Sequence, residues 1–128
     1  GPEGVFVLET KHRTKRRGQQ IFVRDGDLCI DRIVIDPDPR RQAMAAALSV
    51  RRRLEARTGD TVPVRAVVLF PGWFIHDGFK AGECWVLQER SLVTTLQNGK
   101  AARIPPQQVT RIATELDHWA HEPHPDFP

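Results

Sequence analysis

The chain has 128 residues, of which 40% are hydrophobic and 27% are charged, and its formal net charge is +3. This length is enough for about one domain with a buried core, and the composition excludes a disordered or fibrous chain. No apolar run reaches the roughly 18 residues that a membrane-spanning helix needs, and no signal-peptide pattern precedes the first predicted strand, so we expect no membrane partner.

The first part of the chain is predicted to form strands. Gly4–Glu9 is a near-continuous apolar run with β-branched residues, as expected for a strand that is covered on both faces. Gln20–Arg24 and Leu28–Ile35 are two further β-rich runs, and the Asp25-Gly26 sequence between them is a strong hairpin signal.

A long helix is predicted after the hairpin. Asp36-Pro37 ends the second arm, Asp38 is a natural N-cap, and the next proline suits the first helical position. We expect this helix to run to about Arg57 and to end before Gly59. Its core-facing residues, at helical spacing, are Ala43, Met44, Ala47, Leu48 and Leu54.

The second half supplies two more strands and a closing helix. Val64–Phe70 predicts a buried strand that ends at Pro71-Gly72, and Cys84–Leu87 predicts a short strand. Ser91–Leu96 fits either a strand or a helical turn. Pro105–Ala120 predicts a helix, and the residues on its inner face are Val109, Ile112, Ala113, Leu116, Trp119 and Ala120.

This order of elements describes one α/β sheet with helices on its faces. We expect a single domain over residues 1–121 and a tail over residues 122–128. A central strand needs a partner on each side, and the chain opens directly into a buried strand, so further sheet elements are expected upstream of Gly1. Cys29 and Cys84 lack CxxC and Cys/His spacing, which favours buried, reduced thiols in the cytoplasm, with a disulfide as the alternative if their strands are neighbours.

Basic charge is concentrated in the first half of the chain. Residues 1–60 hold 13 of the 19 Lys and Arg but only 9 of the 16 Asp and Glu. The excess lies around Lys11–Arg17 and along Arg40–Arg57. Such asymmetry favours a polyanionic partner, and a solvated charged face is the alternative.

Glu9 and Lys11 are the strongest candidates for chemistry. Residues i and i+2 of a strand point to the same face, so these two side chains are expected side by side. A carboxylate there can bind a hard cation such as Mg²⁺ or Mn²⁺, and the ammonium group can orient a water and stabilise negative charge on a phosphate. The alternative is a surface ion pair worth well under ~1 kcal/mol.

The segment from Gly1 to Lys11, Gly-Pro-Glu-Gly-Val-Phe-Val-Leu-Glu-Thr-Lys, resembles the signature of the NERD (nuclease-related) domain, a branch of the PD-(D/E)XK nuclease-like superfamily. A Pro-x-x-Gln-Ala segment that opens a helix in that family is matched by Pro39–Ala43. Its later apolar strand ending in Phe-Pro is matched by Val67–Pro71, and its closing helix by Pro105–Ala120.

The resemblance implies a restriction-endonuclease-like mixed sheet flanked by helices, here lacking its N-terminal elements, and a metal-dependent nuclease site. Glu9 would be a metal ligand for Mg²⁺ or Mn²⁺, Lys11 would lie beside the attacking water, and Gln42 would face the same site from the helix start. The family's upstream aspartate has no counterpart here, and Glu3 lies in the turn, too far to replace it. The candidate substitutes are the hairpin acids Asp25, Asp27 and Asp31.

A basic segment follows Lys11 at once and is suited to holding a nucleic-acid backbone, although a solvated turn is the alternative. The candidate nucleic-acid-binding residues are Arg13, Lys15, Arg16, Arg17 and Arg41.

Two other groups are weaker candidates. The spacing of His118, His121 and His124 suggests zinc, but a proline interrupts the helix before the last of them and a fourth ligand is missing. Trp73-Phe74 suggests either an exposed pair for stacking on bases or a cap on the core.

The leading hypothesis is a metal-dependent nuclease domain acting on DNA, which is favoured over RNA, with a homodimer or an upstream segment completing the site. The second hypothesis is a non-catalytic nucleic-acid-binding module with a degenerate nuclease fold. The third is an interaction domain in which Glu9 and Lys11 form only an ion pair.

Overall fold

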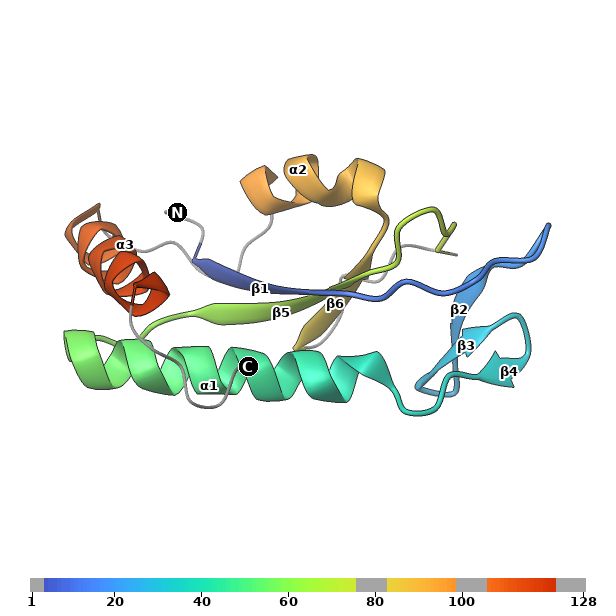
Figure 1. The fold of residues 1–128 in the computed structure, drawn as a ribbon, viewed down its shortest axis with the longest axis horizontal. Helices are drawn as coiled ribbons and strands as arrows, with labels where there is room; N and C mark the ends of the chain where they lie inside the picture. The colour runs from blue at the N-terminus through green and yellow to red at the C-terminus, as the bar shows by residue number, and fades with distance from the viewer. Residues whose placement is uncertain (1–3, 76–82, 99–105, 122–128) are drawn as a thin grey trace.

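The computed structural model of the chain describes residues 4–75, 83–98 and 106–121 (Figure 1). In chain order the elements are β1 (Val5–Thr10), β2 (Ile21–Arg24), β3 (Asp27–Ile30), β4 (Ile33–Val34), α1 (Pro39–Thr58), β5 (Val64–Leu69), β6 (Cys84–Leu87), α2 (Glu89–Asn98) and α3 (Pro106–Ala120). None of these helices combines the length and the apolar character that crossing a bilayer requires.

The main sheet consists of three parallel strands in the order β1-β5-β6. Helix α1 covers one face of this sheet and α2 lies over the other (Figure 1). The strand side chains alternate accordingly, because Val68 packs in the cluster that contains the α1 residues, whereas Val67 and Leu69 pack in a separate cluster with Leu92 of α2. Together with the antiparallel hairpin sheet, this confirms the predicted mixed α/β sheet flanked by helices.

The central strand of this sheet is β5 rather than β1. Among the described residues β1 pairs with β5 alone, and Leu8 of β1 is 44% exposed. The prediction that the first strand is covered on both faces is therefore wrong for its second half. Leu8 lies on the same strand face as Phe6, which packs in the cluster with Leu92 of α2, but Leu8 itself is not part of that cluster.

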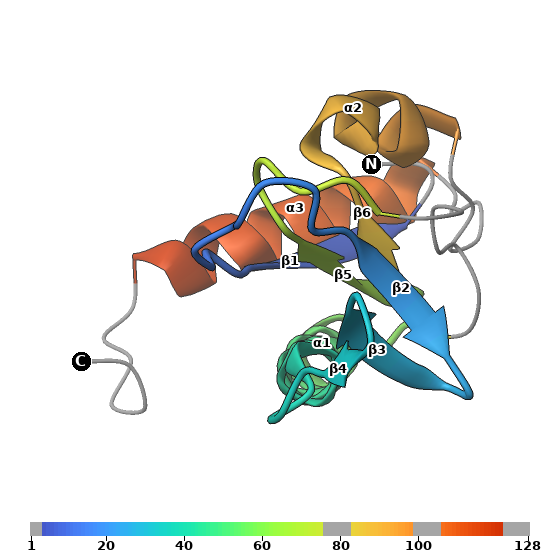
Figure 2. The same ribbon diagram turned by 90° about the vertical axis from the view of Figure 1, so that its right-hand side faces the viewer.

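A second sheet, of order β2-β3-β4, lies beyond the carboxyl end of β1 and beside the start of α1 (Figure 2). The predicted turn at Asp25-Gly26 is confirmed, with positive φ angles of 51° and 81° that suit a two-residue hairpin. The predicted strand Leu28–Ile35 is divided in two, because Asp31 adopts a φ of 52° and reverses the chain. Cys29 of this sheet and Cys84 of the main sheet are both buried and free, so the reduced thiols are confirmed.

Helix α1 begins and ends with the caps that the sequence predicts. The Oδ1 atom of Asp38 accepts a hydrogen bond from the backbone N–H of Arg40, and Gly59 closes the helix with a φ of 73°. Ala43, Ala47 and Leu54 are buried and Met44 is half-buried, as predicted. Leu48 is 39% exposed, so its place in the core was wrongly predicted.

Helices α2 and α3 complete the fold. The segment that fitted either a strand or a helical turn lies in α2. Helix α3 packs on α1 through Ile112, which shares a buried cluster with Leu54. Ala113 and Ala120 are exposed rather than on the inner face, and the α3 residues that pack in the cluster with Leu54 are Val109, Ile112 and Leu116. The predicted tail lies outside the described residues.

Candidate functional site

Glu9 and Lys11 lie at the carboxyl end of β1 and point to the α1 face of the sheet. The backbone N–H of Lys11 donates to the carbonyl oxygen of Leu69, which extends the pairing with β5 by one residue and fixes the direction of both side chains. The Nζ atom of Lys11 is 3.1 Å from Oε1 of Glu9, and both side chains are partly exposed. The pairing expected from strand geometry is therefore present.

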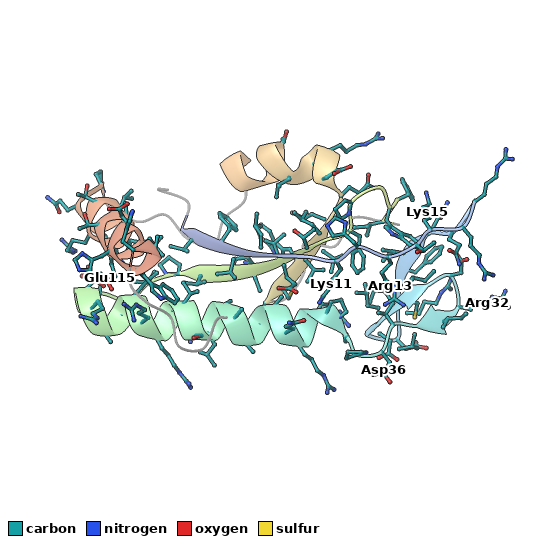
Figure 3. All side chains as sticks on the ribbon, in the orientation of Figure 1. Lys11, Arg13, Lys15, Arg32, Asp36 and Glu115 are labelled. Atoms are coloured by element: carbon teal, nitrogen blue, oxygen red, sulfur yellow. The ribbon has the colours of Figure 1, made fainter. Side chains whose placement is uncertain are left out.

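Gln42 meets this pair from the first turn of α1. Its Oε1 atom accepts a hydrogen bond of 2.9 Å from Nζ of Lys11, across 31 residues of sequence. Glu9, Lys11 and Gln42 thus form one cluster around the lysine, which we call the Glu-Lys-Gln cluster. Figure 3 shows Lys11 between β1 and the start of α1.

The start of α1 is held in place by Arg40. Its guanidinium group binds both carboxylate oxygens of Asp38, at 2.7 to 3.1 Å, and donates at 2.7 Å to the carbonyl oxygen of Gly26 in the hairpin turn. Burial alone would raise the pKa of Asp38, but the hydrogen bonds from the side chain and backbone of Arg40 outweigh it, so the net pKa is lowered. The same hydrogen bond raises the pKa of Arg40.

The basic segment after β1 is exposed and anchored at its middle. Arg13, Lys15, Arg16 and Arg17 all face solvent, as does Arg41 in the first turn of α1. The carbonyl oxygen of Arg13 accepts a hydrogen bond of 3.4 Å from the indole of Trp73, and Nζ of Lys15 lies 6.0 Å from the centre of the same ring. In Figure 3, Arg13 and Lys15 lie beyond the end of β1, on the same side of the molecule as the hairpin.

Trp73 and Phe74 do not act as a pair. Trp73 is only 3% exposed and belongs to the core, as the alternative interpretation of this dipeptide predicted. Phe74 is 49% exposed, while its carbonyl oxygen accepts a hydrogen bond of 3.0 Å from the N–H of Ile21. Trp73 therefore packs beneath the surface of this turn, and the ring of Phe74 is exposed on it.

The described residues offer one carboxylate to a cation at the Glu-Lys-Gln cluster. No group of three His, Cys, Asp or Glu capable of holding a metal is formed in residues 4–75, 83–98 and 106–121. The hairpin acids Asp25, Asp27 and Asp31 therefore form no such group with Glu9, and Oδ1 of Asp31 accepts a hydrogen bond of 3.1 Å from the backbone N–H of Gln20. Of the histidines in the zinc hypothesis, His121 lies directly after α3 and contacts Asp117 of that helix, and His124 lies outside the described residues.

One carboxylate is a small donor set, but it is compatible with a hard cation that also binds substrate. Mg²⁺ commonly takes one or two carboxylates and completes its shell with waters and phosphate oxygens. Glu9 has one oxygen on Lys11 and a second oxygen available to a cation. Glu9 therefore fits a metal that binds together with a phosphate, rather than one held by the protein alone.

A pocket of about 220 Å³ lies at the same edge of the sheet and includes residues that the sequence did not single out. Its lining comes from the basic segment, the turn after β5 and the start of α2: Lys15, Trp73, Phe74, Gln88, Glu89 and Arg90. The adjacent charges of Glu89 and Arg90 are evident in the sequence, but they do not indicate a pocket as long as the secondary structure of that segment is undecided. Arg40 was also missed, although its spacing from the predicted N-cap Asp38 was a usable clue.

The fold and the cluster together define a protein of the nuclease-related class. The family model described as "Nuclease-related domain" (NERD) matches residues 1–71, which is more than half of the chain. The chain therefore belongs to the NERD family, within the PD-(D/E)XK nuclease-like superfamily. Comparisons with curated proteins and with solved structures find no match.

Proposed function

We propose that this chain hydrolyses DNA phosphodiester bonds with the help of Mg²⁺ or Mn²⁺. The observation that carries the proposal is the Glu-Lys-Gln cluster, in which Lys11 contacts both Glu9 and Gln42 at the exposed end of a strand. Membership of the nuclease-related family supports it. The functional unit in this proposal is residues 1–121, with residues 122–128 as a tail.

Glu9 is the proposed metal ligand. A bound divalent cation supplies Lewis acidity at the phosphate and lowers the pKa of a water. Glu9, the one carboxylate of the cluster, would hold this cation, and phosphate oxygens of the substrate would supply further ligands. A second copy of the chain is a proposed source of further carboxylate.

Lys11 is the proposed catalytic residue that touches the reacting phosphate. An ammonium group has three N–H donors, and the contacts with Glu9 and Gln42 use two of them. The third donor is then directed to a phosphate oxygen or to the attacking water, where it stabilises developing negative charge. Gln42 is a positioning residue, since its oxygen holds Lys11 without reaching the phosphate itself.

The exposed cations of the basic segment are the proposed binding surface for the DNA backbone. Arg13, Lys15, Arg16 and Arg17 lie next to the cluster in sequence, and Arg41 is adjacent to Gln42. Contacts of this kind set the register of a nucleic acid on a protein without reading its sequence. The free thiols of Cys29 and Cys84 are compatible with the cytoplasmic location that forms part of the proposal.

Cleavage of end-labelled single- and double-stranded DNA, with Mg²⁺, Mn²⁺ or EDTA, tests the proposal. We expect Lys11→Ala and Glu9→Gln to lower the rate roughly 100-fold or more. The matched control is Arg111→Gln on α3, which breaks an exposed ion pair of 2.7 Å with Asp60 in the loop after α1 and should leave the rate unchanged. Cleavage that survives both Lys11→Ala and Glu9→Gln would reject the site.

A second candidate function is favoured by the same small donor set. With one carboxylate at the cluster, a DNA-binding module without cleavage is the alternative. It is distinguished by salt-dependent DNA binding with no cleavage under any metal condition. Under either function, Arg17→Ala should weaken binding and lower the salt slope by about 1. Absence of DNA binding at low salt would contradict both.

A further inference from the structure

The pocket lined by Lys15, Phe74 and Arg90 shares an edge with the Glu-Lys-Gln cluster. The carboxyl ends of the parallel strands β1, β5 and β6 meet there. The backbone N–H of Lys11 donates to the carbonyl oxygen of Leu69 in β5, and Leu69 pairs in register with Leu87 of β6, which directly precedes the pocket residue Gln88. Two strand spacings, or about 10 Å, therefore separate β1 from the strand that leads into the pocket. Under the proposed function, a nucleic-acid strand bound at the cluster would therefore have the pocket within reach along this edge.

The exposed ring of Phe74 gives the pocket a stacking surface. The ring is half-exposed, and the hydrogen bond from Ile21 to its carbonyl oxygen fixes its backbone. The buried indole of Trp73 lies next to it and ties the basic segment to this turn. A half-exposed aromatic ring on a fixed backbone is suited to stacking on a base, because every nucleobase has a π-face.

The polar lining is that of a base site rather than of a simple anion site. Lys15 and Arg90 supply positive charge for phosphates on either side of a base. Glu89 would repel a lone phosphate, but its carboxylate can accept hydrogen bonds from the amino group of cytosine or adenine. Gln88 has its amide fixed by a hydrogen bond of 3.4 Å from Nε2 to the carbonyl oxygen of Ile75.

The size of the pocket favours a single base. Its volume of about 220 Å³ is below the roughly 300–1,000 Å³ of sites for drug-sized ligands. A base that is stacked in a duplex cannot enter such a pocket without being extruded, which costs a few kcal/mol, whereas a base in a single strand enters freely.

We propose that this pocket receives one unstacked base of a single-stranded DNA substrate and that it sets a preference for single strands over duplexes. The inference rests on the proposed function, since it specifies that the DNA cleaved at the Glu-Lys-Gln cluster is single-stranded. It assigns stacking to Phe74 and recognition of a base amino group to Glu89.

Equilibrium binding by fluorescence anisotropy in EDTA, which prevents cleavage, tests this assignment. The probes are an oligo-dC strand, an oligo-dT strand, a strand of abasic sites and a duplex. We expect Phe74→Ala to weaken binding of oligo-dC and oligo-dT roughly 5- to 150-fold and to leave the abasic strand and the duplex unchanged. The matched control is Ile33→Ala, at an apolar side chain that is 74% exposed on β4, which should change nothing.

Glu89→Gln is the second variant, because it removes charge without removing volume. We expect it to weaken oligo-dC relative to oligo-dT, since thymine lacks the amino group that a carboxylate accepts from. Both changed residues are exposed, and urea unfolding curves confirm that the variants fold.

The outcomes separate this inference from the function on which it rests. If the wild-type chain cleaves DNA but Phe74→Ala binds all four probes as the wild type does, the pocket assignment is wrong and the proposed function stands. An equal loss on the abasic strand also overturns the assignment, because the lost contact is then not with a base. If the wild-type chain neither binds nor cleaves any DNA, the proposed function fails and the inference fails with it.

Discussion

Asp38 connects the fold to the Glu-Lys-Gln cluster, and its replacement gives the most informative stability measurement. The residue caps α1 through the N–H of Arg40 and binds the guanidinium group of the same arginine with both oxygens. The cap contributes about 1 kcal/mol, and the ion pair, which is about four-fifths buried, contributes about another 1 kcal/mol. Asp38→Ala should therefore cost about 2 kcal/mol, whereas Asp38→Asn keeps a cap and should cost about half of that.

Urea unfolding followed by circular dichroism measures these differences. With a slope of roughly 1.5 kcal/mol per M, Asp38→Ala should lower the midpoint by a little over ~1 M without changing the slope. Because the pKa of Asp38 is lowered in the folded protein, its carboxylate stabilises the fold above the ordinary value of 3.8. This stabilisation is lost as the pH falls through the lower pKa that Asp38 has in the folded protein. The gap between the wild type and Asp38→Asn should accordingly be full at pH 7 and should narrow below pH 3.8.

Two results would refute this account of α1. If Asp38→Asn is as stable as the wild type at pH 7, the ion pair with Arg40 contributes nothing. If the gap between them persists unchanged into acid, the stabilisation does not come from the ionised carboxylate. A parallel loss of DNA cleavage in Asp38→Ala, with Lys11 untouched, would show that the helix start also positions Gln42.

Two further predictions concern the core. Burial raises the pKa of Cys84 from 9.0 to about 11, so its thiol should react with iodoacetamide at pH 8 far more slowly than a free cysteine, and rapid alkylation of native protein would contradict this. The fold should also lose stability as the pH rises from about 9 through 11, because the thiol of the unfolded chain loses its proton at a lower pH than the buried thiol does. Leu54→Ala should cost about 2–5 kcal/mol, since the side chain is fully buried in a cluster with Val5, Val62 and Ile112. The exposed Leu48→Ala should cost under ~1 kcal/mol, and equal unfolding midpoints for the two variants would contradict the burial of Leu54 in this cluster.

The elements of the fold could be predicted where local chemistry decides them. The caps of α1 are local, since Asp38 and Gly59 satisfy backbone groups within a few residues of themselves. The turn at Asp25-Gly26 is equally local. The division of the second hairpin arm at Asp31 was missed because aspartate in the left-handed region is allowed but not required. The position of β1 in the sheet could not be predicted either, since strand order depends on contacts between distant segments.

The site shows the same difference between local and distant information. Strand alternation was enough to place Glu9 beside Lys11, because both lie within three residues of each other. The contact between Lys11 and Gln42 spans 31 residues, so it could be predicted only from the family resemblance. The pocket brings together three segments and depends on the helical state of α2, which the sequence left open. No local pattern could have identified Gln88 or Glu89.

The hairpin gives α1 a fixed starting point, and this explains how an exposed lysine acquires a defined position. Arg40 links the hairpin turn at Gly26 to the N-cap Asp38, so the helix start cannot shift without breaking a hydrogen bond to the turn. One turn into the helix, Gln42 accepts a hydrogen bond from Lys11 and so gives the ammonium group a second contact besides the one with Glu9. A lysine held by a single exposed carboxylate would sample many conformations, since such pairs are worth at most about 1 kcal/mol. The hydrogen bond to Gln42, which the capped helix α1 holds in place, distinguishes this cluster from a chance ion pair at a strand end.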